Sequence, residues 1–123
     1  MCKTIIAGSR TITDYSIVKE AIRQSNFNIT EVICGLAKGP DLLGEKYALE
    51  NHIPITYFPA NWEELGKYAG VKRNEDMGNY AEQLIAIYDG KSRGTKHMIH
   101  YAKQKGLRTF VFDINTNSLL NFL

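Results

Sequence analysis

Cysteine is scarce in this chain of 123 residues: there are two, Cys2 and Cys34, and no CxxC pair or Cys/His cluster accompanies either. A disulfide framework is therefore excluded, and no metal is expected. The chain also lacks an apolar run close to the ~20 residues that a membrane-spanning helix needs. Its first ten residues, MCKTIIAGSR, are too polar for a signal peptide, so we expect a cytoplasmic protein with reduced thiols.

An excess of charge of one sign is missing as well. Fifteen Lys and Arg stand against thirteen Asp and Glu, which gives a formal net charge of +2. A near-neutral chain has no general affinity for nucleic acid or for an anionic membrane, so we expect neither as a partner. The length suits a single domain, residues 1–123, that needs no disulfide or metal in order to fold. Any anion site must come from a local arrangement of residues.

Short apolar runs rich in β-formers alternate with amphipathic segments along the chain. We predict strands at 3–8, 31–35, 54–58, 83–89 and 108–114. We predict helices at 14–25, 39–52, 61–82 and 94–106, the third broken near Gly66 or Gly70, with a last short turn or helix in the tail. Alternation with short links indicates right-handed βαβ crossovers. The fold class is therefore α/β, with a parallel sheet covered by helices on both faces.

Three of the loops at the carboxyl ends of these strands are rich in glycine. They read GSRT at 8–11, GLAKGPD at 35–41 and DGKSRGT at 89–95, and each leads toward a helix. Ligands of open parallel sheets bind beyond the carboxyl ends of the strands, where glycines let backbone N–H groups approach an anion and helix N-termini add partial positive charge. One such loop is weak evidence, because glycines also close tight turns. Three at one edge predict a phosphate-binding pocket.

None of the three loops carries a standard nucleotide-binding motif. The Walker A pattern GxxxxGK[ST] is absent, and neither GSRTIT nor GLAKGP matches GxGxxG. These absences disfavour an ordinary ATPase or a dinucleotide-dependent dehydrogenase. In the last loop, Ser92 and Thr95 flank a helix start, where they either cap the helix or bind a ligand.

The elements GSR, G-x-A-x-G-x-D, FPA-x-W, AG-x-x-RN-x-x-M and DG-x-S-x-GT occur in this order within residues 3–114. In these elements the chain resembles the small YspA-like SLOG proteins of bacteria and phages. The resemblance implies a Rossmann-like three-layer fold with a mainly parallel five-stranded sheet and a pocket for a nucleotide-derived ligand. The one departure is Pro40, where relatives usually carry a small residue, and a helix start tolerates proline.

The wider superfamily includes cytokinin-activating phosphoribohydrolases, DNA-processing proteins and nucleotide-sensor domains. The phosphoribohydrolases carry PGGxGTxxE and RKxxM, and Arg73 in RNEDM matches their arginine, while Gly94 and Thr95 match their GT pair. Met98 stands at the position of the catalytic glutamate. Glycosidic cleavage needs a carboxylate, and a thioether can neither hold charge nor transfer a proton. The resemblance therefore implies binding without catalysis and assigns no catalytic residue.

The alternative is a phosphoribohydrolase or N-glycosidase in which another carboxylate replaces the glutamate. Asp41, Glu75 and Asp89 are the candidates, and nothing in the sequence selects one of them. His97 and His100 have the spacing of a metal pair on a helix, but no third ligand is evident. We therefore expect these two histidines on the surface.

The candidate ligand-binding residues lie in the glycine-rich loops or in the elements of the resemblance. Arg10 and Arg73 suit phosphate or carboxylate groups, which guanidinium forks bind bidentately. Asp41 either caps the second helix or binds ribose hydroxyls, and Trp62 either stacks on a base or packs. The full set is Gly8, Ser9, Arg10, Gly35, Lys38, Gly39, Asp41, Trp62, Arg73, Asn74, Asp89, Gly90, Ser92, Gly94 and Thr95.

We therefore predict a protein that senses or sequesters a small nucleotide-derived signal, such as an ADP-ribose derivative or a cyclic nucleotide, without catalysis and without a cofactor. A homodimer or a larger homo-oligomer is expected, because relatives commonly pair through helices and a small domain can complete its pocket with a neighbour's residues. Binding of single-stranded nucleic acid is a third hypothesis, and the near-neutral charge disfavours it.

Overall fold

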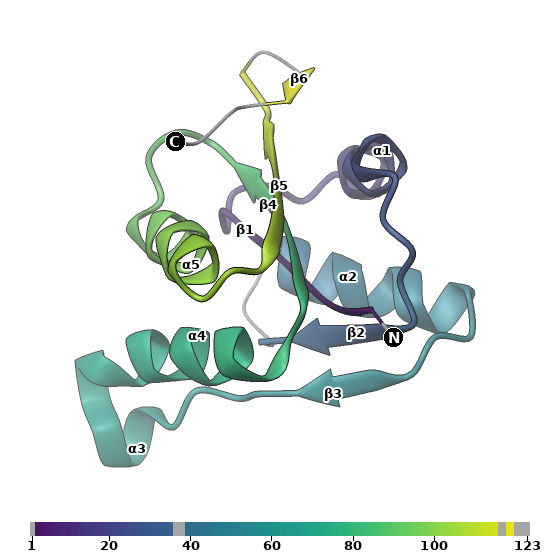
Figure 1. Cartoon of the computed structure of the whole chain (residues 1–123). Coiled ribbons are helices and arrows are strands. Elements are labelled where there is room, and N and C mark those ends of the chain that lie inside the picture. The colour runs from purple at the N-terminus through teal and green to yellow at the C-terminus, as the bar shows by residue number, and fades with distance from the viewer. Residues whose placement is uncertain (1, 36–38, 116–117, 120–123) are drawn as a thin grey trace.

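The computed structural model describes residues 2–35, 39–115 and 118–119, which form a sheet with helices on both faces (Figure 1). The strands are β1 (Lys3–Gly8), β2 (Glu31–Cys34), β3 (Ile55–Tyr57), β4 (Gln83–Tyr88), β5 (Arg108–Asp113) and β6 (Ser118–Leu119). They lie in the order β3-β2-β1-β4-β5-β6, and the first five are parallel. The chain runs outward from β1 to β3 and then returns to the far side of β1 as β4. The strand order therefore reverses between β1 and β4, the point where open α/β sheets bind ligands.

Helices cover both faces of the sheet (Figure 1). They are α1 (Tyr15–Ser25), α2 (Pro40–Glu50), α3 (Trp62–Leu65), α4 (Ala69–Tyr80) and α5 (Arg93–Gln104), with a single 3₁₀ turn, η1 (Gly66–Tyr68), between α3 and α4. Helices α1 and α2 pack on one face, and α4 and α5 pack on the other. The predicted α/β class, with a Rossmann-like three-layer arrangement and a mainly parallel sheet, is confirmed.

The central strands are buried on both faces, which explains their continuous apolar sequences. Ile5 of β1 and Leu84 of β4 belong to the core cluster under α4 and α5. The next residue in each strand, Ile6 or Ile85, belongs to the cluster under α1 and α2. Each of these side chains is at most 1% exposed. The sheet is therefore a rigid support for the loops at its carboxyl edge.

Helix starts follow the capping rules. Asp14 is the N-cap residue of α1, and its Oδ1 accepts a hydrogen bond from the Ser16 N–H, with an N–O distance of 2.9 Å. Pro40 is the first residue of α2, where its missing N–H costs nothing. The predicted break in the third helical segment lies at Gly66, whose φ of +54° is a left-handed conformation.

The tail follows its prediction only in part. A short turn or helix is predicted there, and residues 114–115 do form a turn, but Ser118–Leu119 then forms strand β6, which pairs antiparallel with β5. The open edge of β5 offers unpaired backbone groups to this segment, and such pairing overrides a weak local preference. Residues 116–117 and 120–123 of the predicted tail lie outside the described residues. Within the described residues, no helix has the length and apolar character needed to cross a membrane.

A substitution at Gly8 tests how tightly the carboxyl end of β1 packs against its neighbours. A Cβ at this position would lie 2.2 Å from the Ile87 carbonyl oxygen and 2.8 Å from Pro40 Cγ. Since the carbonyl belongs to the paired strand β4, Gly8→Ala should lower the free energy of unfolding by about 1–3 kcal/mol. Urea denaturation followed by circular dichroism measures this. Gly94→Ala is the matched control, because a Cβ there meets no protein atom within 4 Å; equal losses in the two variants would contradict the packing argument.

Candidate functional site

A pocket of about 350 Å³ opens at the carboxyl ends of β1 and β4, where the strand order reverses. Its volume lies at the lower end of the range for small-molecule sites. Segments from four parts of the chain line it, with the residues Ala7, Gly8, Arg10, Thr11, Asp41, Arg73, Asn74, Asp89, Ser92, Gly94, Thr95 and Met98. Nine of these are among the candidates that the sequence singled out. Their contacts with a ligand stay predictions.

Four other candidates, Ser9, Gly35, Gly39 and Gly90, are not among these lining residues. Lys38 and the side chain of Trp62 lie outside the described residues, and so does the choice between stacking and packing for that indole. Thr11, Ala7 and Met98 also line the pocket, although they are not among the candidates. The signal for Thr11 was its position directly after GSR, and the signal for Met98 was its match to the position of the catalytic glutamate, whereas Ala7 is inconspicuous in the sequence.

Ser9 is 1% exposed, and its described contacts are with the protein. Its N–H donates to the Ile87 carbonyl at 3.0 Å, and its carbonyl accepts from the Ile12 N–H at 3.0 Å. Its hydroxyl oxygen accepts from the Asp89 N–H at 3.1 Å. Ser9 therefore ties the loop after β1 to the end of β4 and to the loop that follows it.

Gly35 and Gly39 allow the second loop to pack tightly. Gly39 has a φ of +82°, and a Cβ there would lie 2.9 Å from the Ser9 carbonyl oxygen. A Cβ at Gly35 would lie 2.7 Å from Asp41 Oδ2 and 2.9 Å from Arg73 Nη1. These glycines therefore let a neighbouring loop and two charged side chains approach the backbone.

Arg73 and Asn74 link α4 to two other parts of the site. Arg73 Nη1 donates to the Gly35 carbonyl at 2.6 Å, and Arg73 Nε donates to Asn74 Oδ1 at 3.2 Å. Asn74 is buried, and its Nδ2 donates to the Gly94 carbonyl at 3.1 Å and lies 3.3 Å from His97 Nδ1. Among the described residues, the two contacts of Arg73 use two of the five N–H donors of its guanidinium.

Asp89 shapes the loop that leads into α5. Its Oδ1 accepts hydrogen bonds from the N–H groups of Lys91 and Ser92, at 2.8 and 2.9 Å. Burial opposes ionisation of the Asp89 carboxyl, but these two N–H groups and the Ser9 hydroxyl together outweigh that effect and hold its pKa below the ordinary value. Asp89 is therefore ionised at neutral pH.

The start of α5 lies against the pocket. Ser92 is its N-cap residue, and its Oγ accepts from the Thr95 N–H at 3.3 Å and lies 3.0 Å from Thr95 Oγ1. The capping alternative for Ser92 is therefore confirmed. For α2 the cap position belongs to Gly39, and Asp41 lies in the first turn with 4% exposure. The alternative in which Asp41 is the cap of that helix is wrong.

The pocket contains two cationic and two anionic side chains. Arg10 is exposed at its mouth and makes no hydrogen bond or ion pair with the residues that the structure describes. Arg73 is half-buried and lines the pocket together with Asp41 and Asp89. The described residues contain no group of three or more His, Cys, Asp or Glu that could hold a metal ion. The arrangement suits a ligand that carries both anionic and hydroxyl groups.

The two helix histidines differ in their environments. His97 is half-buried between Asn74 and Tyr101, with 6.1 Å between the ring centroids of His97 and Tyr101. His100 is exposed, as we expected for both. His97 therefore takes part in the contact between α4 and α5 instead of standing on an open surface.

Asp89→Asn should weaken the dependence of folding stability on pH below about 4. The pKa of Asp89 in the folded protein lies below its ordinary value of 3.8, so the ionised carboxylate stabilises the fold above that pH. This contribution is lost as the pH falls through the lower, folded-state pKa. The asparagine amide keeps an acceptor oxygen for the two N–H groups but does not titrate there. Urea unfolding across this acidic range tests the expectation, and parallel stability curves for the two proteins would refute it.

Comparisons with known proteins identify the family. The model of the YspA, cpYpsA-related SLOG family matches residues 2–65. The chain is 30% identical to the Gene 61 protein of Mycobacterium phage D29 over 122 residues, which cover 91% of this chain and 97% of that protein. It is also 33% identical over 60 residues to the uncharacterized SPbeta prophage-derived protein YoqJ of Bacillus subtilis (strain 168), which is 49% of this chain and 30% of YoqJ. No solved structure matches. The chain belongs to the YspA, cpYpsA-related SLOG family.

Proposed function

We propose that this protein binds a small nucleotide-derived ligand, of the ADP-ribose type or a cyclic nucleotide, in the pocket between β1 and β4. The protein senses or sequesters the ligand without changing it. Membership of the SLOG family indicates a role that involves nucleotide derivatives. The observation that carries the finer proposal is the pocket itself, which gathers glycine loops, a helix N-terminus and two arginines at the point where the strand order reverses.

The phosphate end of the ligand belongs at the first turn of α5. Gly94 and Thr95 line the pocket there, and no acidic residue lies in that turn. Helix N-termini present free N–H donors and partial positive charge to anions. Arg10 has no described partner, so it is available to complete the anion site with a charge-assisted hydrogen bond.

The carboxylates of Asp41 and Asp89 favour a ligand that carries other groups besides phosphate. Asp41 and Asp89 would repel a ligand that consists only of phosphates, but they accept hydrogen bonds from sugar hydroxyls. At Asp89 the two backbone N–H groups use two of about four lone-pair sites of the carboxylate. A phosphorylated ribose, as in a nucleotide derivative, supplies both kinds of group.

Binding without catalysis rests on Met98. Its side chain is 1% exposed and lines the pocket, where the phosphoribohydrolases would carry the catalytic glutamate. Asp89 is a weak proton acceptor, because two backbone N–H groups already stabilise its carboxylate. Glu75 is not among the described lining residues.

The alternative enzyme, a phosphoribohydrolase or N-glycosidase, would rely on Asp41. Asp41 is 4% exposed and lines the pocket. Enzymes commonly bury the carboxyl group that transfers a proton. The alternative predicts that Asp41→Asn abolishes turnover of a nucleotide substrate.

We further propose that the protein works in the cytoplasm as a homodimer or a larger homo-oligomer. Within the described residues neither Cys2 nor Cys34 forms a disulfide, as is usual in a reducing compartment. Leu42 and Leu49 lie two turns apart on α2 and are 42% and 63% exposed, and Tyr57, whose hydroxyl donates to Glu45 of the same helix, is 44% exposed. An apolar surface of this kind favours contact with a second copy.

A ligand panel tests the pocket. ADP-ribose derivatives, cyclic nucleotides and nucleoside phosphates are screened for a rise in melting temperature, and a ligand at ~100 times its Kd should add about 2.7 kcal/mol of stability. Gly94→Ala should weaken binding at least about tenfold, because its methyl group enters a pocket that is otherwise unchanged. Arg73→Ala should weaken binding by roughly ten- to a hundredfold. Arg23→Ala, which removes a charge from α1, is the control.

Analysis of the ligand recovered from the protein distinguishes a binding protein from an enzyme. Chromatography after long incubation and heat release should return the ligand intact. Free base or ribose phosphate formed over many turnovers would show that the alternative enzyme is correct. A broad panel that gives no shift for folded protein would rule out the pocket as a nucleotide site.

The assembly proposal is tested by light scattering coupled to size exclusion. The wild-type particle should have a mass at least twice the 13.9 kDa of one chain. Leu49→Glu should shift it toward the monomer, because a carboxylate on the apolar face of α2 cannot be buried in an interface without a partner. Leu65→Glu makes the same change at a leucine that is 40% exposed on α3, and it should leave the mass unchanged. A monomeric wild type at micromolar concentration would contradict the proposal.

A further inference from the structure

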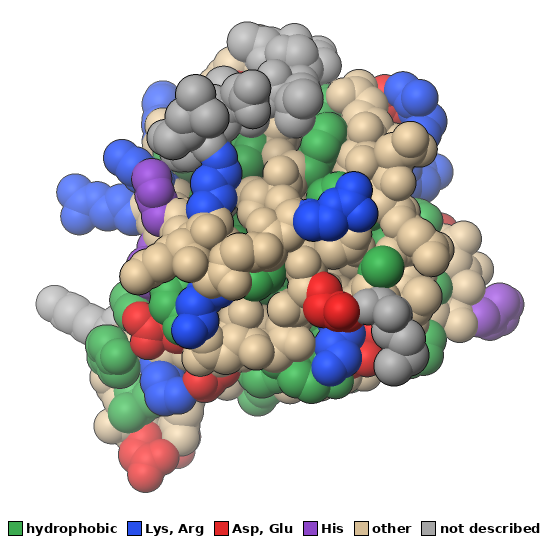
Figure 2. All heavy atoms as spheres, in the orientation of Figure 1, with side chains coloured by type: hydrophobic (Ala, Val, Ile, Leu, Met, Phe, Trp, Pro, Cys, Tyr) green, Lys and Arg blue, Asp and Glu red, His purple; other side chains and the backbone are tan. Residues whose placement is uncertain are grey.

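Helix α5 carries two histidines, and they differ in what they contact. Figure 2 shows histidine side chains on the side of the molecule where Figure 1 places α5. His100 is exposed, whereas His97 is half-buried and contacts α4, where its Nδ1 lies 3.3 Å from Asn74 Nδ2. Neither histidine is among the described lining residues of the pocket, but Asn74 is. His97 therefore contacts the site from behind its wall.

The hydrogen bonds of Asn74 fix the orientation of its amide group. Its Oδ1 accepts from Arg73 Nε at 3.2 Å, and its Nδ2 donates to the Gly94 carbonyl at 3.1 Å. The Arg73 Nε–H can only donate and the Gly94 carbonyl can only accept. Turning the amide round would therefore place donor against donor and acceptor against acceptor. The amide nitrogen, which can only donate, is thus the group that faces His97.

This orientation determines the state of the His97 ring. Because Asn74 Nδ2 can only donate, His97 Nδ1 must accept, and the proton of the neutral imidazole is then on Nε2. A doubly protonated ring has two donors and no acceptor, so it would face Asn74 donor to donor. Tyr101 packs beside the ring, with 6.1 Å between the ring centroids, and its hydroxyl donates to Asn79 Oδ1 of α4 at 2.8 Å. The ring of His97 is therefore held between two side chains that are tied to α4.

We propose that His97 is a positioning residue of the pocket and acts through Asn74. With its second amide hydrogen held by His97, Asn74 keeps one orientation, in which it binds Arg73 and the Gly94 carbonyl together. Arg73 and the first turn of α5 are therefore kept at a fixed separation. Groups that contact one ligand need such support, because a binding geometry must be held within about 0.5 Å. The inference rests on the proposed function, since these are the groups that would hold the ligand.

Asn74 and Arg73 have different tasks in the proposed site. Asn74 is 7% exposed although it lines the pocket, and both of its amide hydrogens have partners in the protein. Its amide is therefore not left to donate to a base or a sugar. Arg73 uses two of its five N–H donors in described contacts, which leaves the others for a ligand. Arg73 thus binds the ligand, and Asn74 and His97 orient Arg73.

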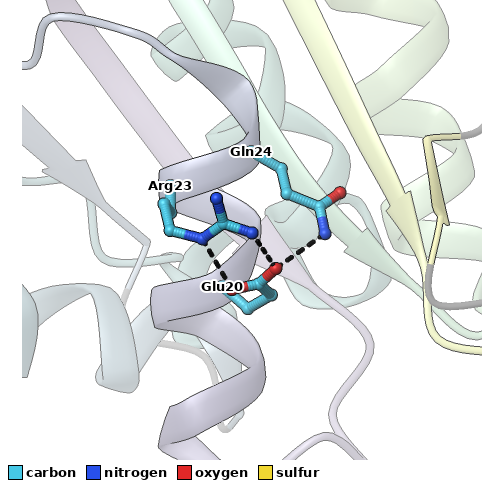
Figure 3. Close-up of polar contacts among 3 residues, drawn as sticks. All are labelled: Glu20, Arg23 and Gln24. Carbon is cyan, nitrogen blue, oxygen red and sulfur yellow. Dashed lines mark hydrogen bonds and ion pairs between the residues drawn. The ribbon is translucent and has the colours of Figure 1, made fainter.

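The polar contacts on α1 provide a contrast. Gln24 Nε2 donates to Glu20 Oε2 at 2.8 Å, and Arg23 donates to both oxygens of the same carboxylate (Figure 3). All three residues belong to one helix, and the side chains of Arg23 and Glu20 are 70% and 41% exposed. Solvent weakens exposed contacts of this kind, and they hold no second element in place. Asn74 differs in both respects, because it is buried and joins α4 to α5.

Heteronuclear NMR at neutral pH tests the inference without any ligand. His97 should be the tautomer with a protonated Nε2 and an unprotonated Nδ1, and the Arg73 Nε–H should exchange slowly with water. His97→Leu removes the acceptor and should speed this exchange roughly two- to tenfold, the effect of losing one hydrogen bond. His97→Asn places an amide oxygen near the position of Nδ1 and should keep the wild-type rate.

Titration calorimetry with ADP-ribose and with cyclic AMP then measures the effect on binding. His97→Leu should weaken binding roughly two- to tenfold, and His97→Asn should restore it. His100→Leu is the matched control, because it makes the same substitution at the exposed histidine one turn further along α5. It should leave both the exchange rate and the affinity unchanged. Circular dichroism confirms that each variant is folded.

The outcomes separate this inference from the proposed function. A wild type that binds neither nucleotide counts against the proposed function, while the tautomer and the exchange rates still decide the inference. The inference is overturned if His97 Nδ1 carries a proton in the wild type, or if the Arg73 Nε–H exchanges equally fast in the wild type and in His97→Leu. It is also overturned if a nucleotide that binds the wild type binds His97→Leu equally well, or if His97→Asn loses as much affinity as His97→Leu. Because the tautomer is measured in the wild type, it decides even where a variant does not fold.

Discussion

The site depends on one close approach, that of the end of β1 to the end of β4. Ser9 fixes it with two hydrogen bonds, to the Ile87 carbonyl and from the Asp89 N–H, while a third, from the Ile12 N–H, closes the loop after β1. The approach is possible because Gly8 has no side chain that would strike the Ile87 carbonyl. Since the strand order reverses here, the two loops leave the sheet side by side, and the third loop packs through Gly39 on the loop that follows β1. A pocket follows from that convergence.

Glycine has two different uses in these loops. Gly8, Gly35 and Gly39 are required by the protein's own packing, because a Cβ at each would lie within 3.0 Å of another atom. Gly94 differs, since a Cβ there would meet nothing within 4 Å although the residue lines the pocket. Its small size serves no packing purpose in the described structure, so in the proposed function it is the glycine that leaves room for the ligand. A glycine-rich sequence does not separate these two uses, because both leave the same residue in the chain.

The sequence predicts the sheet and the helices well because both depend on local patterns. Continuous apolar runs mark the doubly buried strands, and the side-chain periodicity of α1 and α5 marks their buried faces. It does not reveal which groups a loop residue meets in the folded chain. The hydrogen bonds of Ser9 and the link from Arg73 through Asn74 to Gly94 join residues that are distant in sequence. The strand at Ser118–Leu119 was missed for the same reason, since the open edge of β5 induces it.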